Sequence, residues 1–176
     1  MDGRTAYRFD AHQVATPSFV VALGLIRRNL DVLAGVKEGT GCKILLALKG
    51  FAMWSVFPVL RGVLNGVCAS SPHEARLGRE EFGREVHAFA AGYSQSDIFD
   101  LCTTADHIVF NSPNQVKLYA EMVKNSQRPI EIGLRVNPEL STQDHALYDP
   151  SSPFSRLGTT ARNFDESQVE LLDGLH

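Results

Sequence analysis

The sequence predicts an α/β fold with a mostly parallel sheet, in the form of a partial (β/α)8 barrel. Short apolar or β-branched runs alternate with longer segments of helical period, which is the pattern of repeated βα units. Each strand and its helix take roughly 20 to 25 residues, somewhat fewer than the typical figure of about 30. The chain has 176 residues, whereas a complete barrel usually needs about 250. We therefore expect about five to six βα units.

The expected strands are short and rich in Val, Ile, Leu and Ala. They are 19–21, 43–48, 66–69, 86–91, 107–111 and 130–136. A further strand is expected to begin in 172–176, after a helical stretch at 165–171. A complete doubly wound sheet of five or six strands also suits this length. The barrel is preferred because the last residues look like the entry into another strand.

The expected helices show apolar residues three or four positions apart, as Ile26, Leu30 and Leu33 are. They are 25–36, 54–64, 72–82, 95–105 and 114–123. Two serines, Ser94 and Ser112, are expected N-caps. The prolines at 72 and 113 suit the first helical turn, where a missing N–H costs nothing.

The composition indicates a soluble globular domain, with 44% hydrophobic and 21% charged residues. A formal net charge of −3 leaves no basic stripe, so we expect a small polar ligand and not nucleic acid. The longest apolar stretch near the N-terminus, 14–26, is short and contains Pro17, so neither a signal peptide nor a membrane span is expected. We therefore expect a cytoplasmic protein.

The cysteines and histidines indicate no metal site. Cys42, Cys68 and Cys102 are widely spaced in apolar segments, which predicts reduced thiols in the core of a cytosolic protein. The six histidines show no HxxxH or HxxH pairing and no CxxC companion. The charged residues of 74–85 are expected to form the solvated face of a helix and its exit.

Lys49 is the candidate for chemistry. It ends the apolar run ILLAL at 44–48 and is followed by Gly50. Active sites of parallel-sheet folds lie at the carboxyl ends of strands, and a partly desolvated amine there is a usable Schiff-base nucleophile. The alternative is that Lys49 only caps a buried strand with a solvated charge.

Four segments resemble one family of enzymes. They are CKILLALKGFAMWSVF at 42–57, ASSPHEARLGREEFG at 69–83, HIVFN at 107–111 and GLRVNP at 133–138. Together they resemble carboxynorspermidine decarboxylase, which uses pyridoxal 5′-phosphate (PLP) and has the fold of the alanine racemase and ornithine decarboxylase type. The resemblance runs from about residue 16 to the end of the chain.

The resemblance implies that Lys49 carries PLP covalently. It implies a PLP-binding barrel, of which 16–176 is the N-terminal part after an extension at 1–15, and a C-terminal β domain that this sequence does not contain. It also implies a homodimer that decarboxylates carboxynorspermidine or carboxyspermidine to norspermidine or spermidine. Arg135 is placed near the cofactor ring, although it equally suits an arginine that anchors a loop through carboxylates. Ser155 and Arg156, in SRLG, are candidates for substrate binding or for ordering their loop.

One departure separates this chain from the ornithine decarboxylase-like members. They carry an aspartate on the second strand, whereas this chain has CASS at 68–71, which favours the carboxynorspermidine branch. The phosphate loop, the acidic partner of the pyridine nitrogen and the histidine that stacks on the cofactor are all expected beyond His176. We therefore expect the 176 residues alone to be inactive. Two alternatives stay open: a non-catalytic PLP-binding or interaction protein on a truncated barrel, and a related PLP amino-acid decarboxylase or racemase.

Overall fold

The computed structural model describes residues 9–144, 149–152 and 154–176. The chain divides into two units, Met1–Cys42 and Lys43–His176. The described part of the first unit holds a short 3-10 helix, η1 (Ala11–Gln13), and the helix α1 (Leu23–Thr40). α1 ends at Gly41, whose φ of 70° suits glycine. None of the helices in the described ranges is long and apolar enough to cross a membrane.

The predicted strand at 19–21 is wrong. These residues are irregular and directly precede α1, and the Phe19 side chain is 95% exposed. A strand needs a neighbour that takes up its backbone hydrogen bonds. The first unit, as far as it is described, contains no other strand.

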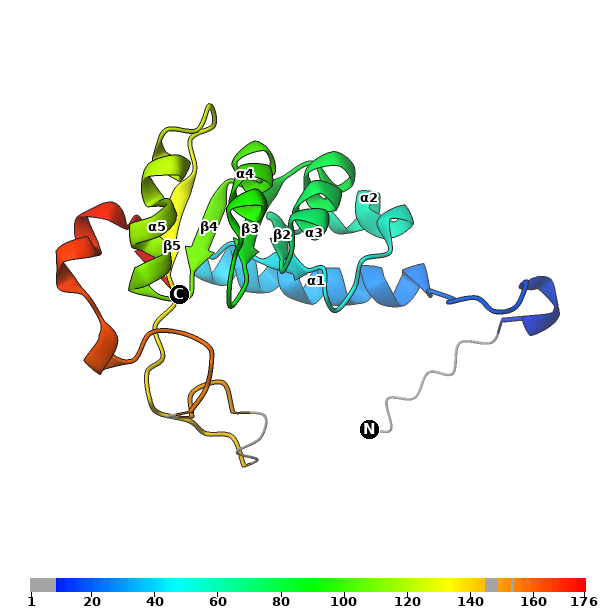
Figure 1. Cartoon of the computed structure of the whole chain (residues 1–176). Coiled ribbons are helices and arrows are strands. Elements are labelled where there is room, and N and C mark those ends of the chain that lie inside the picture. Colours follow the sequence, from blue (N-terminus) through cyan, green and yellow to red (C-terminus); the bar gives the residue numbers. More distant parts are fainter. Residues whose placement is uncertain (1–8, 145–148, 153) are drawn as a thin grey trace. The chain divides into compact units, whose positions relative to one another are not determined.

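The second unit is built on one parallel sheet of six strands in sequence order (Figure 1). The strands are β1 (Leu45–Ala47), β2 (Gly66–Ala69), β3 (Glu85–Phe89), β4 (His107–Phe110), β5 (Glu131–Leu134) and β6 (Gly174–Leu175). This order is that of consecutive βα units in a barrel, as predicted. The expected sixth strand is present, β2 has its predicted bounds, and the bounds of the other strands differ from the prediction by one to a few residues.

The helices of this unit follow the predicted segments. They are η2 (Trp54–Val56), α2 (Phe57–Leu60), α3 (Pro72–Leu77), the π-helix η3 (Gly78–Phe82), α4 (Gln95–Thr104), α5 (Pro113–Lys124) and the 3-10 helices η5 (Ala161–Asn163) and η6 (Glu166–Leu171). Both predicted serine caps are confirmed, since each side-chain oxygen accepts a backbone N–H of the first turn. The predicted helix 54–64 ends at Leu60, and a turn leads from there into β2.

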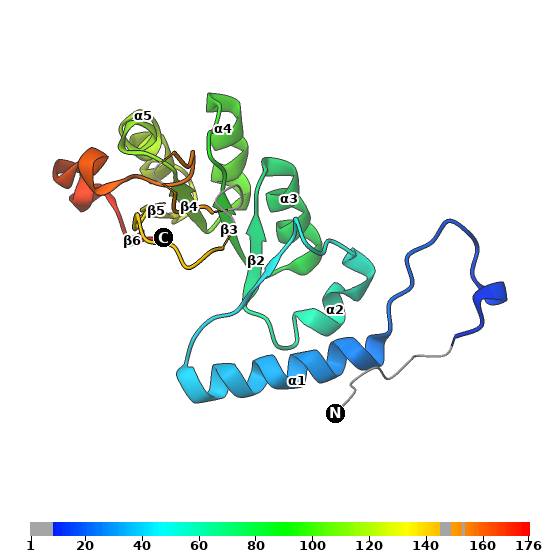
Figure 2. The ribbon, with the colours of Figure 1, turned by 90° about the horizontal axis from the view of Figure 1, so that it is seen from below.

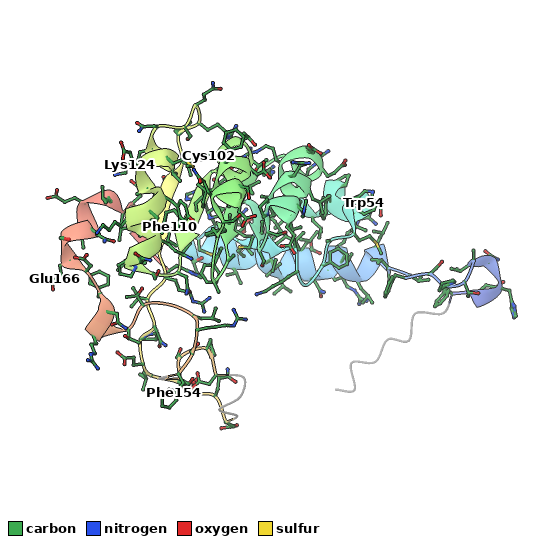
Figure 3. The ribbon with its side chains drawn as sticks, viewed as in Figure 1. Trp54, Cys102, Phe110, Lys124, Phe154 and Glu166 are labelled. Carbon is green, nitrogen blue, oxygen red and sulfur yellow. The ribbon has the colours of Figure 1, made fainter. Side chains whose placement is uncertain are left out.

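The core lies between the sheet and the helices α3, α4 and α5, which cover one of its faces (Figures 1 and 2). Alternate residues of the central strands fill this layer and are almost completely buried: Val86, Ala88, Ile108, Phe110, Ile132 and Leu134. Phe110 sits inside it, whereas Phe154, on the segment after β5, is 99% exposed (Figure 3). The residues between the core positions point to the opposite side of the sheet, which we call the inner face.

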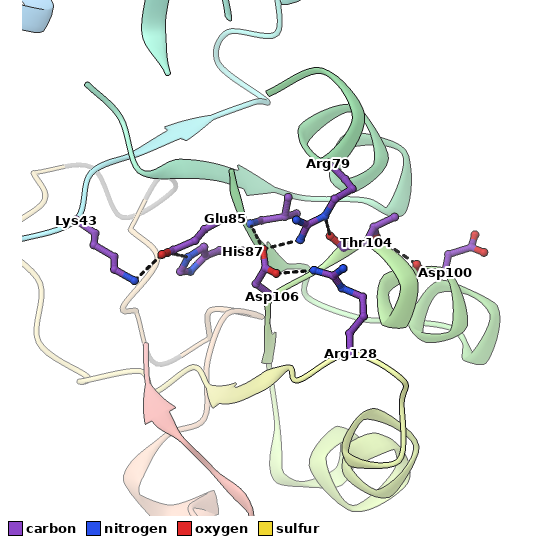
Figure 4. Close-up of polar contacts among 9 residues, drawn as sticks. Lys43, Arg79, Glu85, His87, Asp100, Thr104, Asp106 and Arg128 are labelled. Atoms are coloured by element: carbon purple, nitrogen blue, oxygen red, sulfur yellow. Dashed lines mark hydrogen bonds and ion pairs between the residues drawn. The ribbon is translucent and has the colours of Figure 1, made fainter. Parts of the chain in front are cut away.

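An ion-pair network joins this core to the amino ends of β3 and β4 (Figure 4). Asp106, just before β4, binds Arg79 of η3 and Arg128, the latter at 2.8 Å, and it accepts the N–H of Val86 at 2.8 Å. Burial acts to raise the pKa of Asp106, but these donors outweigh it and hold that pKa below its usual value. Arg79 is therefore part of a network between elements and not, as expected, of a solvated helix face.

Candidate functional site

Four polar side chains follow the carboxyl ends of strands in the second unit. Lys49 follows β1, Asn111 follows β4, Arg135 follows β5 and His176 follows β6. Since all six strands are parallel, these ends meet at one edge of the sheet. Active sites of such sheets lie at this edge.

Lys49 lies in a tight turn directly after β1. The carbonyl of Ala47 closes the turn by accepting the N–H groups of Gly50 and Phe51 at 3.0 and 3.1 Å. Burial raises the pKa of the Cys68 thiol on the neighbouring strand, and the positive charge of Lys49 acts in the opposite direction. The expected desolvation of Lys49 is wrong, because the residue is exposed.

Arg135 lies beside an aromatic ring on the inner face. Its guanidinium carbon is 4.7 Å from the centroid of the Phe89 ring, a cation–π geometry, and burial lowers its pKa. The ring of His176 approaches the same Phe89 at 5.4 Å. Burial is the main cause that lowers the pKa of His176, and the positive charge of Arg135 lowers it further. In the described part of the chain Arg135 forms no ion pair with a carboxylate, so the loop-anchoring alternative finds no support there.

Asn111 holds the segment that contains Ser155 and Arg156. Its side chain donates to the carbonyl of Arg156 at 2.9 Å and accepts the N–H of Gly158 at 2.7 Å. Gly158 has a φ of 81°, and a Cβ there would lie 2.8 Å from the backbone nitrogen of Asn137. Only glycine fits this position.

Ser155 and Arg156 are therefore brought to the end of β4, and in the same segment the N–H of Thr159 donates to the carbonyl of Arg135 at 2.8 Å. The Ser155 hydroxyl accepts the N–H of Leu157 at 3.1 Å and so takes part in ordering the loop. The side chain of Arg156 is exposed. Asn111 has no role in the sequence-based prediction, although a polar residue that ends the apolar run HIVF is the same signal that marks Lys49.

A second polar cluster lies on the inner face, at the amino ends of the strands. It consists of Lys43, Glu85, His87, His107 and Glu131. Lys43 binds Glu85 at 2.6 Å, Glu85 binds His87 at 3.1 Å, and Glu131 binds His107 at 3.0 Å. The hydrogen bond from Lys43 is the main cause that holds the pKa of Glu85 below its usual value. The expectation that Glu85 belongs to the exit of a solvated helix is wrong, because it begins β3.

The three cysteines are free, but none of them is a core residue. Cys42 and Cys68 are exposed, and Cys102 is partly exposed. Cys68 belongs to an apolar strand, but it points to the inner face, which α3, α4 and α5 do not cover. The expectation of core thiols is wrong for this reason: an apolar run does not show which of its alternate positions faces the helices.

The fold of this unit matches part of the barrel of the alanine racemase-like decarboxylases. No family model matches the chain. Carboxynorspermidine/carboxyspermidine decarboxylase of Herminiimonas arsenicoxydans is 36% identical over 162 residues, which are 92% of this chain and 43% of that protein. Carboxyaminopropylagmatine decarboxylase of a Synechocystis strain is 42% identical over 146 residues, which are 83% of this chain and 37% of that protein.

Solved structures agree with these similarities. Carboxynorspermidine decarboxylase from Campylobacter jejuni, crystallised with norspermidine, superposes with a TM-score of 0.81 at 30% identity over 93% of this chain and 41% of that one. Diaminopimelate decarboxylase from M. jannaschi, with a TM-score of 0.71 at 17% identity, shares the fold. The chain is thus homologous to the N-terminal portion of carboxynorspermidine decarboxylases and spans about two fifths of their length.

Proposed function

We propose that this chain forms the lysine-bearing part of the active site of a PLP-dependent decarboxylase. The proposed substrate is carboxynorspermidine or carboxyspermidine, and the product norspermidine or spermidine. The observation that carries the proposal is the place of Lys49 at the carboxyl end of β1, within a chain homologous to these decarboxylases. The homodimer implied by the resemblance and the cytoplasmic location expected from the sequence belong to the same proposal.

The residues at this edge suit the covalent attachment of the cofactor and one border of its ring. Lys49 offers an exposed primary amine at the rim of the inner face, as covalent attachment requires. Arg135, held over Phe89, offers a cation on the same edge. PLP, when bound, supplies the electron sink for the carbanion left by the departing carbon dioxide. Its phosphate and pyridine nitrogen need further groups, which the described residues around Lys49 do not include.

The chain's own residues would hold and orient the reacting molecules. Lys49 would bind the cofactor, and Arg135 would border its ring. Asn111 orders the loop of Ser155 and Arg156, and the exposed Arg156 guanidinium suits the carboxylate of the substrate. Because most non-covalent contacts of the cofactor would come from the part of the relatives that this chain does not span, we expect weak binding of PLP.

Reductive trapping tests the role of Lys49. The 176-residue chain would be incubated with PLP and borohydride, and the modified lysines located by peptide mass spectrometry. We expect the label to concentrate on Lys49 and to be lost in Lys49→Arg, whereas Lys117→Arg, on an exposed position of α5, should leave it unchanged. Equal labelling of all lysines would contradict the proposal.

Carbon dioxide release tests the expected inactivity. The same chain, supplied with PLP and carboxynorspermidine, should release no carbon dioxide above the level of free PLP. Turnover that disappears in Lys49→Ala would show that these residues suffice for catalysis. Carboxyaminopropylagmatine should be compared in the same assay, because a decarboxylase with that name is 42% identical to this chain.

A further inference from the structure

Three side chains that suit a metal ion converge on the inner face. Glu85 and His87 are two residues apart on β3, and His107 of β4 is the register partner of His87. Residues i and i+2 of a strand share a face, and a directly paired residue shares it with them. One ligand atom from each of the three lies within 4.8 Å of the others, and all three residues are partly buried.

Neighbouring charges already orient two of these ligands. Lys43 donates a hydrogen bond to one oxygen of the Glu85 carboxylate, Oε1. The other oxygen, Oε2, lies 3.1 Å from Nε2 of His87 (Figure 4). The Glu131 carboxylate binds Nδ1 of His107 at 3.0 Å, which leaves Nε2 of that ring for a metal. A carboxylate behind a ligating histidine is the usual arrangement around protein-bound zinc, where it sets the tautomer and the ring orientation.

The two imidazoles lie next to each other. Their rings stack with centroids 3.8 Å apart and planes inclined by 14°, so at least one ring must turn out of the stack for both to bind one ion, since each nitrogen lone pair lies in the plane of its ring. A metal binds the neutral ring. Access is open, because His87 and His107 line a cavity of about 220 Å³, and Glu85 and His107 line a neighbouring one of about 650 Å³.

We propose that Glu85, His87 and His107 bind a divalent transition-metal ion of the zinc class, with one coordination position left for water. Two imidazole nitrogens and one carboxylate oxygen are ligands that Zn²⁺ accepts, whereas Mg²⁺ and Ca²⁺ require oxygen ligands. Zinc bonds of about 2.1 Å place tetrahedral ligand atoms about 3.4 Å apart, so side-chain rotations that unstack the two rings complete the site.

This site is separate from the proposed PLP edge. It lies at the amino ends of the strands, with His87 two positions before Phe89 on β3. It uses neither Lys49 nor Arg135. The sequence predicts no metal site because the metal-binding spacings that it could show lie along one helix or loop. Here the ligands are joined by strand register across twenty residues of sequence.

Metal titration of the tag-free, EDTA-treated chain tests the proposal. We expect one Zn²⁺ per chain by calorimetry and one Co²⁺ with intense visible bands of tetrahedral type. His87→Gln and His107→Gln should each weaken binding at least tenfold, and Glu131→Gln about ten- to a hundredfold. His73→Gln, at an exposed position of α3, should leave the affinity unchanged. Equal losses in His73→Gln and His107→Gln, or no saturable binding, would overturn the proposal.

A measurement on the unmodified sequence avoids variants that fail to fold. Diethyl pyrocarbonate carbethoxylates accessible imidazole nitrogens, and mass spectrometry locates the products. Zn²⁺ should slow the reaction of His87 and His107 by at least tenfold and leave that of His73 unchanged. Equal reaction of His87 and His107 with and without Zn²⁺ would overturn the proposal.

Discussion

At the level of single residues, Lys49 has two interpretations that the thiol of Cys68 can separate. An amine that approaches the inner face acts on this thiol, on the neighbouring strand β2, whereas an amine that only caps its strand does not. Burial raises the pKa of the Cys68 thiol, and the positive charge of Lys49 opposes the rise. Cys68 can therefore report where the Lys49 amine lies.

Alkylation of Cys68 should depend on Lys49. Because burial raises the pKa of this thiol, its reaction with iodoacetamide should accelerate only at a higher pH than that of an ordinary thiol. Lys49→Met removes the nearby cation, so the midpoint should move to still higher pH. Peptide mass spectrometry gives the rates, with Cys42 as the reference that should not change. An unchanged profile would place the amine away from the inner face.

At the level of elements, two glycines set how closely β2 packs against its neighbours. A Cβ on Gly66 would lie 2.1 Å from the carbonyl oxygen of Glu85, on the paired strand β3. A Cβ on Gly78 would lie 2.4 Å from a methyl group of Val67. Gly78 is also where the predicted helix 72–82 changes from α3 to the π-helix η3. The close approach of this helix to the sheet therefore depends on glycine.

Gly66→Ala should destabilise the second unit. The added methyl group meets backbone atoms that cannot rotate away, so we expect a loss of about 3 kcal/mol in the free energy of unfolding, at the upper end of overpacking effects. Urea denaturation followed by circular dichroism measures it. Gly92→Ala is the matched control, since its Cβ would meet only the Gln115 amide at 3.8 Å. Similar stabilities of the two variants would disprove the close packing.

At the level of the whole molecule, the described sheet has two edge strands, β1 and β6. β1 pairs only with β2 and β6 only with β5 among the described strands. Both outer strands consist of Leu, Ala and Gly residues. Unpaired apolar strands recruit other chains, and proteins often prevent this with a lysine at the edge.

We expect the 176-residue chain to self-associate with rising concentration, and Ala47→Lys to reduce this association. Ala47 is the exposed last residue of β1, so a charge there interrupts pairing along the strand. Sedimentation velocity over a series of concentrations measures the effect. Leu118→Lys, on the helix α5 and 60% exposed, is the control. If Leu118→Lys dissociates the assemblies and Ala47→Lys does not, the association involves the helices and not the edge strand β1.

The fold could be predicted from the sequence because its βα units are local. Strand and helix periods, serine caps and N-terminal prolines identify each unit within about 25 residues; the strands β2 to β5 and the helices α3 to α5 are therefore found close to their predicted bounds. The strand expected at 19–21 fails, since a strand also needs a partner, and partners are not encoded locally.

For the candidate site, the sequence by itself singled out Lys49 as the candidate, because its motif is distinctive and it ends an apolar strand. Only the tertiary structure decided what surrounds it. The register of parallel strands brings Asn111, Arg135 and His176 to the same carboxyl edge. It also gathers Glu85, His87 and His107 at the amino ends of β3 and β4. Parallel neighbours are separated by a whole crossover, so no short spacing in the sequence reports that their side chains meet.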